Sequence, residues 1–320
     1  MEHPLKILFV INDLYTRGNG LAASARRTIA LLREHGHHVR ILSALPRDGD
    51  DCGVGMPEYV LPPLRIPLVD PLIASQGYAF ALAKRREIER ALAWADVVHL
   101  EEPFYLQAVV ARYARRRGVP VVATYHIHPE NLTASVCLDR ALPLNRAILE
   151  LWKRAIFNRS DLVQCPSRSV YERVSKLCVR APLLLLSNGV PLGEEMSGGG
   201  HEVGESSVVR ILVVGRFSRE KDQATILRAL RHSAHARSIQ LTFAGRGPTE
   251  HSLRASARRL LRRGVITHPL RFAFMSADEL AREASSCDLY VHAARIEVEG
   301  LSALEVLRHG VVPIIARGPL

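Results

Sequence analysis

Short apolar runs alternate with longer segments of helical periodicity along almost the whole chain. The run at residues 5–11 is continuously apolar after Lys6, as is typical of a strand buried in a parallel sheet. Residues 21–34 then repeat apolar side chains at helical spacing, and Gly36 follows where such a helix would end. Because this alternation continues to the last residues, the sequence predicts parallel sheets with helices on both faces.

The same reading predicts the other elements. Before residue 190, further strands are expected at residues 39–42, 97–100, 119–124, 162–165 and 183–186, and helices at 80–93, 106–116, 144–157 and 170–178. After residue 207, strands are expected at residues 209–214, 240–244, 271–274, 288–292 and 311–315, and helices at 223–230, 250–261 and 301–307. Residues 5–11 and 209–215 are similar, so each is expected to open a domain.

The predicted elements fall into two domains. Residues 193–207 contain Gly198-Gly199-Gly200 and several acids but no apolar periodicity, which indicates a linker or a long loop. We therefore expect a domain at residues 1–190, a linker at 191–207 and a second domain at 208–320, both doubly wound α/β sheets. In such sheets ligands bind beyond the carboxyl ends of the strands, and here the cleft between the domains is the expected site.

Composition narrows the class of protein. None of the apolar runs among the 320 residues approaches the roughly 18 that span a bilayer, and the first residues do not form a signal peptide. The five cysteines include no Cys-x-x-Cys pair, so neither a zinc site nor a disulfide framework is indicated, and a cytoplasmic location is expected. A net charge of +11 suits anionic partners such as phosphorylated ligands, nucleic acid or an acidic membrane face.

A glycine loop precedes the first helix. The segment from Gly18 through Gly20 to Ala23 fits the pattern G-x-G-x-x-A of a dinucleotide site, which is one alternative. Six residues separate the strand from Gly18, however, and the acidic residue expected after the second strand is missing. The broader interpretation is that this loop offers backbone N–H groups at a helix start to an anion or a hydroxyl-rich ligand.

The second domain carries paired charges at its strand ends. Arg216 and Lys221 follow the first strand, and two cations five positions apart could clamp a diphosphate, although such residues also commonly cap loops. Glu297, in a loop, and Glu305, in the following helix, could contact one ligand, or they could be acids stabilised by the helix dipole. Glu299 shares the loop with Glu297 and leaves the assignment between them open.

Histidines and acids also follow strands of the first domain. His126 comes directly after the strand ending at Thr124, where an imidazole can donate to a substrate hydroxyl or act as an acid or base. Glu101 and Glu102 follow the strand at residues 97–100. These groups together with His128 could be imagined as metal ligands, but their spacing is not that of a metal site, and no metal is predicted.

Taken in order, these segments resemble the retaining glycosyltransferases of the GT-B fold, family 4, from Lys6 to about Ala316. The most specific part is residues 288–315, which resemble the family's E-x7-E segment and its Gly-x-Pro-x-Ile strand, with one extra residue before Pro313. The other similar segments are residues 214–221, the G-x-G-P turn at 244–248 and the turn at 186–190. The resemblance implies two Rossmann-like domains facing a cleft.

The resemblance also implies roles for the charged residues. Arg216 and Lys221 would neutralise the pyrophosphate of a nucleotide-sugar donor. Glu297 would hold the sugar hydroxyls near the reacting carbon, and Glu305 would hold the ribose hydroxyls. No metal or cofactor is then needed, because fixed cations and backbone N–H groups can stabilise the leaving diphosphate.

Further site residues follow from the same resemblance. The loop with Gly18 and Gly20 would close on the donor phosphates, and His126 matches the family histidine near the sugar. Gly300 and Leu301, between the two glutamates, would also bind the donor. The resemblance implies a front-face route, in which the leaving phosphate helps to deprotonate the acceptor and the sugar keeps its configuration.

The implied activity is transfer of a sugar, with a UDP-sugar the expected donor, to a hydroxyl acceptor. The acceptor is expected to be lipid-linked or a cell-surface glycan precursor, and the basic first domain could dock peripherally at the cytoplasmic membrane face. Nucleic acid is not an expected partner. Family members normally continue beyond the Gly-x-Pro strand, so the second domain is expected to be incomplete. A non-catalytic nucleotide-sugar-binding remnant and a nucleotide-sugar epimerase of GT-B fold remain alternatives.

Overall fold

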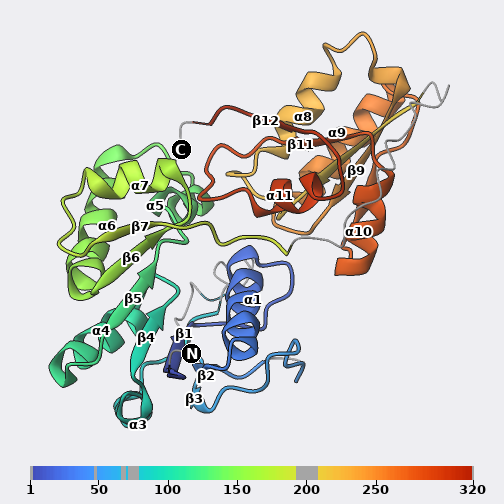
Figure 1. Cartoon of the computed structure of the whole chain (residues 1–320). Helices are drawn as coiled ribbons and strands as arrows, with labels where there is room; N and C mark the ends of the chain where they lie inside the picture. Colours follow the sequence, from blue (N-terminus) through green and yellow to red (C-terminus); the bar gives the residue numbers. More distant parts are fainter. Residues whose placement is uncertain (1–2, 47–48, 66–69, 71–78, 192–207, 319–320) are drawn as a thin grey trace. The chain divides into compact units, whose positions relative to one another are not determined.

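The computed structural model describes residues 3–46, 49–65, 70, 79–191 and 208–318. The chain divides into two compact units, Met1–Asn188 and Gly189–Leu320 (Figure 1). The predicted linker at 191–207 lies, from residue 192 on, outside the described residues. Each unit is a parallel sheet with connecting helices, as the alternation of apolar runs and helical periodicity predicts.

The first unit contains a parallel sheet in the order β3-β2-β1-β4-β5-β6-β7. Its strands are β1 Lys6–Val10, β2 His38–Ala44, β3 Tyr59–Leu61, β4 Val97–Leu100, β5 Val121–Thr124, β6 Leu162–Cys165 and β7 Leu183–Leu185. Its helices are α1 Gly20–Glu34, α3 Arg85–Trp94, α4 Tyr105–Arg117, α5 Pro129–Thr133, α6 Leu142–Ala155 and α7 Arg168–Ser175, with short 3₁₀ turns η1 Ala134–Val136 and η2 Phe157–Arg159. The strand order reverses between β1 and β4, which places the expected ligand-binding edge at their carboxyl ends.

The core of the first unit forms around β1. Leu8, Phe9 and Val10 are fully buried because both faces of this central strand are covered, which explains its uninterrupted apolar sequence. The α1 helix packs on the sheet with its own apolar stripe, including Ala25 and Ile29. This packing fixes the loop between β1 and α1 at the carboxyl edge of the sheet.

The second unit has the sheet order β10-β9-β8-β11-β12. Its strands are β8 Val209–Val214, β9 Ile239–Ala244, β10 Arg271–Ala273, β11 Leu289–His292 and β12 Pro313–Ile315. Its helices are α8 Gln223–Leu230, α9 Glu250–Arg262, α10 Ala277–Ser286 and α11 Leu301–Leu307, with a 3₁₀ turn η3 Ala236–Ser238. Like β1, β8 lies in the interior of its sheet, between β9 and β11, so the two similar segments do open equivalent sheets.

The elements differ from the predicted ones mainly where packing overrides local pattern. The helix predicted from residue 80 begins only at Arg85, because Ala81 pairs with Pro63 and its N–H donates to the side chain of Asn12 at 3.0 Å. The short strand β3 and the five-residue α5 were not predicted. Nor was α10, which buries only Ala284 and so lacks an apolar stripe. None of the described helices is both long and apolar enough to cross a bilayer.

Candidate active site

The loop between β8 and α8 carries both predicted cations. The Arg216 guanidinium forms an ion pair with Glu220, whose side chain is buried within the same loop. The Lys221 ammonium forms an ion pair with Glu297, from the loop that follows β11. Phe217 anchors the loop, because its fully buried ring lies 6.2 Å from the ring of Phe243. The two cations are therefore held at the carboxyl edge of the central strand.

The Gly245–Gly247 turn after β9 supports this loop by close backbone approach. A Cβ atom at Gly245 would lie 2.1 Å from the carbonyl oxygen of Gly215, and one at Gly247 would lie 2.3 Å from that of Phe217. The Phe217 N–H donates to the carbonyl oxygen of Arg246 at 2.8 Å, which ties the two loops together. Only glycine allows this approach at both positions. The G-x-G-P segment therefore positions the loop between β8 and α8, residues 215–222, which we call the cation loop.

Glu297 is the centre of a polar chain that crosses the carboxyl edge of β11. Besides Lys221, it accepts a hydrogen bond from Nε2 of His292 at 3.0 Å, and Nδ1 of His292 lies 3.1 Å from the Tyr290 hydroxyl. The Tyr290 hydroxyl also lies 2.8 Å from Oγ of Ser302, on α11. Because an ionised carboxylate only accepts, Nε2 of His292 carries the hydrogen of its bond to Glu297.

The electrostatics of Glu297 favour its ionised form. Burial by itself would raise the pKa of this carboxyl, but the positive charge of Lys221 and hydrogen bonds from His292 and Lys221 outweigh it and lower the pKa to about 2. Glu297 is therefore a carboxylate throughout the neutral range. It can accept hydrogen bonds from ligand hydroxyls, and it is not available as a general acid.

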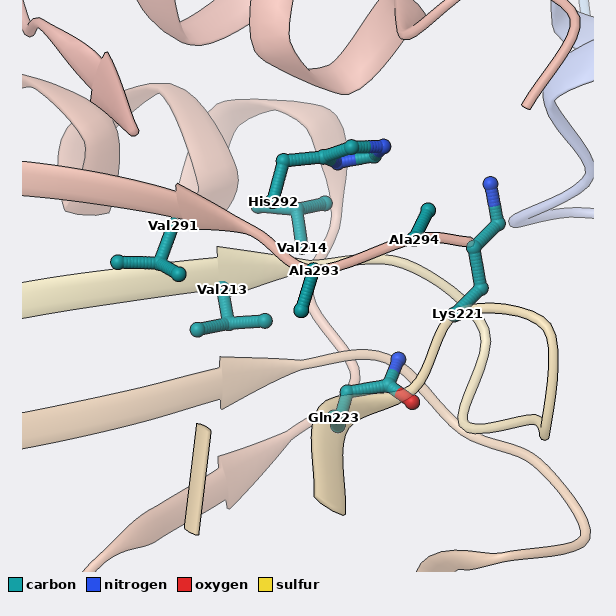
Figure 2. A pocket seen from close by; sticks show the side chains of 8 residues that line it. All are labelled: Val213, Val214, Lys221, Gln223, Val291, His292, Ala293 and Ala294. Atoms are coloured by element: carbon teal, nitrogen blue, oxygen red, sulfur yellow. The ribbon is translucent and has the colours of Figure 1, made fainter. Parts of the chain in front are cut away.

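A small hollow, open to solvent, lies at this edge (Figure 2). Lys221, Gln223 and His292 supply its polar groups, and the remaining lining comes from residues 213, 214, 291, 293 and 294. Gln223 is buried, and its Nε2 donates to the carbonyl oxygen of Arg216 at 2.8 Å. This hydrogen bond holds the cation loop against the start of α8.

The remaining predicted residues of this unit lie around α11. Gly300 is the N-cap of the helix, Leu301 is its first residue, and Glu305 follows about one turn later. A Cβ at Gly300 would lie 3.9 Å from Nε2 of His292, so the start of α11 lies beside the imidazole. Burial, with smaller effects from the charges of Glu297 and Glu305, raises the pKa of Tyr290. Glu305 therefore lies within electrostatic range of the polar chain.

In the first unit, His126 belongs to a buried cluster at the ends of β4 and β5. Its Nε2 lies 2.8 Å from Oε2 of Glu101, whose Oε1 lies 3.4 Å from Nε2 of His99. The same nitrogen of His99 lies 2.8 Å from the hydroxyl of Thr124. Although burial opposes ionisation, the charges of His99 and His126 and a hydrogen bond from His126 lower the pKa of Glu101. Glu101 thus orients His126.

A second buried acid, Glu102, lies next to this cluster. Its Oε2 accepts hydrogen bonds from the backbone N–H of Asn12 at 2.7 Å, from the Asn12 side chain at 2.6 Å and from Gln107 at 2.9 Å. Burial nevertheless raises the pKa of Glu102 to about 7, against an ordinary value of 4.5. The side chain is only 3% exposed, so its charge is poorly solvated.

Glu102 is expected to make the free energy of unfolding depend on pH. Between its unfolded and folded pKa values, the folded state retains a proton that the unfolded state has lost, so stability falls as pH rises, by about 3 kcal/mol over that window. Denaturant unfolding at about pH 5 and about pH 8 should show this fall in the native chain and not in Glu102→Gln. Glu34→Gln, on the exposed end of α1, is the control and should retain the fall. An equal fall in all three chains would contradict the assignment.

The glycine loop before α1 differs from the prediction in one respect. Gly18 has a φ of 76°, and α1 begins at Gly20. The side chain of Asn19 caps the helix by accepting from the N–H of Leu21 at 3.0 Å and of Ala22 at 3.5 Å. These two N–H groups, expected to be open to an anion, are occupied by the cap. A phosphate at this loop would need other donors or displacement of Asn19.

The polar segment after β5 has a structural role at His128. His128 is the N-cap residue of α5, and its backbone N–H donates to the side chain of Asn131 at 2.9 Å. Arg173 of α7 pairs with Glu130 at 2.8 Å and lies 3.2 Å from Nδ1 of His128, which ties α5 to α7. Among the described residues, no group of three or more His, Cys, Asp or Glu side chains could hold a metal ion.

Sequence reasoning did not assign Glu220, His292 or the pairing of Glu101 with His126. Glu220 was visible inside the cation loop, and an acid four residues after an arginine is a recognisable pairing signal. His292 is the last residue of a predicted strand, where ligand-binding groups are expected. The pairing of Glu101 with His126 could not be predicted from the sequence, since the two residues follow different strands.

Two family models match the chain. The model described as Glycosyltransferase Family 4 matches residues 18–194, more than half of the chain, and the one described as Glycosyl transferases group 1 matches residues 205–319. No curated protein matches the sequence.

Several solved structures have a similar fold. HepE of Anabaena, in complex with UDP and glucose, has a TM-score of 0.62 at 16% identity, covering 98% of this chain and 81% of HepE. The pneumococcal O-GlcNAc transferase GtfA, in complex with UDP and GlcNAc, has a TM-score of 0.67 at 10% identity, covering 100% of this chain and 85% of GtfA. A TarM mutant of S. aureus, in complex with UDP and other ligands, has a TM-score of 0.66 at 9% identity, covering 98% of this chain and 87% of TarM. The shared architecture is the GT-B fold.

Proposed function

The chain belongs to glycosyltransferase family 4, and on that premise we propose that it transfers a sugar, with retention of configuration, from a UDP-sugar to a hydroxyl acceptor. Sugar transfer itself follows from the family, and the donor, the stereochemistry and the acceptor are the proposed part. The observation that carries the proposal is the pair of cations, Arg216 and Lys221, held in one loop at the carboxyl edge of β8.

The cation loop suits a nucleoside diphosphate. Arg216 can donate in a bidentate manner to phosphate oxygens, and Lys221 supplies a compact positive charge within the same loop. Each cation is already held by a carboxylate, so little conformational freedom is lost when a diphosphate binds. We propose that these two cations stabilise the leaving diphosphate without a metal ion, and that Glu305 binds the ribose hydroxyls.

Glu297 suits the hydroxyls of the transferred sugar. It is ionised, and it is oriented by His292 on one side and Lys221 on the other. In the proposed front-face reaction, the bond from the sugar's anomeric carbon to the phosphate oxygen breaks while the acceptor oxygen attaches on the same face. The acceptor proton passes to the leaving phosphate oxygen. His126, oriented by Glu101, is proposed to donate a hydrogen bond near the sugar.

The donor preference is tested by binding and by chemistry. Calorimetry against UDP, GDP and NAD should show binding of UDP and not of NAD, because the carboxyl end of β2 lacks the acid of a dinucleotide site. Incubation with a set of UDP- and GDP-sugars should then release nucleoside diphosphate, and NMR of the sugar product should show the donor's anomeric configuration. EDTA should leave the rate unchanged. Binding without hydrolysis or transfer would instead indicate a non-catalytic nucleotide-sugar-binding protein.

A further inference from the structure

The two oxygens of the Glu297 carboxylate have different surroundings. Oε2 accepts hydrogen bonds from the ammonium of Lys221 and from Nε2 of His292, the latter at 3.0 Å. Oε1 makes no hydrogen bond or ion pair with any residue that the structure describes. Because each oxygen of an ionised carboxylate has two acceptor positions, Oε2 is filled and Oε1 retains both of its own. The side chain is 24% exposed, so a ligand can reach it.

The backbone that carries Glu297 is held in place on both sides. The neighbouring side chains of Ile296 and Val298 are buried. The N–H of Arg295 donates to the carbonyl oxygen of Glu220 at 2.8 Å, which ties this loop to the cation loop. With the backbone held, the remaining freedom of the carboxylate is rotation of its own side chain, and the hydrogen bonds to Oε2 decide that rotation.

The imidazole of His292 is itself fixed at the end of β11. The residue is buried, and its Nδ1 lies 3.1 Å from the hydroxyl of Tyr290, a fully buried side chain. That hydroxyl lies 2.8 Å from Oγ of Ser302 on α11. Figure 2 shows the imidazole directed to the same side of the strand ends as the ammonium of Lys221. Contacts at Nδ1 and Nε2 together therefore fix the orientation of the ring.

The two contacts to Oε2 differ in how they respond to a bound donor. The ammonium of Lys221 is a compact charge on a flexible stem, and it is also proposed to bind the diphosphate, which competes with Glu297 for it. The imidazole of His292 is held by β11 and Tyr290 and has no proposed contact with the diphosphate. His292 is therefore the contact that keeps the carboxylate in place when the diphosphate attracts Lys221.

We propose that His292 is a positioning residue for sugar transfer, which holds Oε2 of Glu297 so that Oε1 is the oxygen that accepts from a hydroxyl of the transferred sugar. Tyr290 acts one step further away, by holding the imidazole. The inference rests on the proposed function, because it assigns the atoms that recognise the sugar. It follows that the contribution of one particular sugar hydroxyl depends on His292, although this residue does not touch the sugar.

The test compares two amides at position 292. The amide of glutamine reaches the place of Nε2, whereas the shorter asparagine reaches only that of Nδ1, beside Tyr290. With a nucleotide-sugar that the native chain hydrolyses, His292→Asn should lower kcat about 30-fold, the effect of one lost hydrogen bond to a charged group. His292→Gln should stay within about 3-fold of the native kcat, because it keeps that hydrogen bond. UDP affinity, measured by calorimetry, should stay native in both. Equal losses in both variants would contradict the proposal.

Donors that each lack one hydroxyl of the transferred sugar show whether the loss comes from sugar recognition. The hydroxyl bound by Oε1 is identified as the one whose removal lowers the native rate most. With that deoxy donor, His292→Asn should react about as fast as the native chain, because both changes remove the same contact and their effects are not additive. A general structural defect would lower the rate with both donors equally, and that result would overturn the proposal.

Removal of a buried tyrosine hydroxyl at two places provides a matched pair. Tyr290→Phe should lower kcat about 5-fold, because the imidazole loses its partner at Nδ1. Tyr59→Phe, on β3 of the first unit, removes a buried hydroxyl that accepts from Arg40 at 2.9 Å, and it should keep the native kcat. Equal losses in these two variants would count against a positioning role for Tyr290.

Crystal structures of the native chain and of His292→Asn give a readout that requires no activity. Oε2 of Glu297 should lie within hydrogen-bond distance of residue 292 in the native chain, and the carboxylate should turn away in His292→Asn. An unmoved Glu297 in His292→Asn would overturn the positioning of the carboxylate. If the structures differ as expected but the native chain hydrolyses none of the nucleotide-sugars, the proposed function fails and the positioning of Glu297 by His292 stands.

Discussion

Replacement of Lys221 by alanine is expected to lower the turnover of donor about 100-fold, which corresponds to about 3 kcal/mol of lost transition-state stabilisation. Negative charge grows on the diphosphate as the bond to the sugar breaks, so a fixed ammonium contributes more in the transition state than in the bound donor. The measurement is steady-state release of nucleoside diphosphate, with KM and kcat determined separately. Most of the loss should fall on kcat.

Arg219 offers a matched control in the same loop. Its side chain is exposed and makes no hydrogen bond or ion pair with a described residue, whereas Lys221 is paired with Glu297. Arg219→Ala should therefore retain native turnover, while Arg216→Ala should lose it to a similar degree as Lys221→Ala. If Arg219→Ala were as defective as Lys221→Ala, the loss would reflect net charge, and the assignment of a specific clamp would be wrong.

The second large effect is expected at Glu297. Glu297→Gln should lower turnover by about 100-fold, because it removes the charge that strengthens hydrogen bonds to the sugar hydroxyls as positive charge develops on the ring. Affinity for free UDP should be retained, since the two cations proposed to hold the diphosphate remain. The low pKa of Glu297 also makes a prediction for the pH dependence of the rate of the native chain. Protonation of this carboxyl should not lower the rate near pH 4 to 5, because Glu297 is still ionised there.

Variants of two neighbouring acids, Glu305 and Glu299, test which carboxylate acts in transfer and which in nucleotide binding. Glu305→Gln, on α11, should weaken UDP binding, because this carboxylate is proposed to hold the ribose. Glu299→Gln, in the same loop as Glu297, should leave both turnover and UDP affinity close to native. If the turnover defect appeared in Glu299→Gln and not in Glu297→Gln, the assignment in this loop would be displaced by two residues. Thermal unfolding of each variant measures any loss of folded protein, which an unpaired Lys221 could cause.

The sequence predicted best those elements whose identity depends on local pattern. The bounds of β4, β6, β8, α8 and α11 agree with the predicted ranges to the residue, because each is a short, regular apolar run or stripe between clear breaks. Elements without such a pattern were missed. The strand β3 has three residues, and α10 is polar apart from Ala284, so neither carries a periodic signal.

Most of the candidate site could also be located from sequence, because its residues follow strands. Arg216, Lys221 and Glu297 in the second unit, and His126 in the first, lie just beyond the carboxyl ends of parallel strands, and the topology of a doubly wound sheet brings such ends to one edge within each sheet. The chain order alone therefore indicates where these groups lie, and the resemblance to family 4 indicates what they bind.

Only the tertiary structure decided how these groups are paired and therefore what charge they carry. Lys221 meets Glu297 across 76 positions, and His126 meets Glu101 across 25, so neither pairing leaves a periodic trace in the sequence. The pKa of Glu102 rises to about 7 while that of Glu297 falls to about 2, although both are glutamates after apolar strands. Burial opposes ionisation of both, and the difference arises because the cation of Lys221 packs against Glu297, while Glu102 accepts hydrogen bonds from neutral amides and lies near the charge of Glu101. Sequence determined which groups reach the edge of each sheet, and packing determined their neighbours and hence their chemistry.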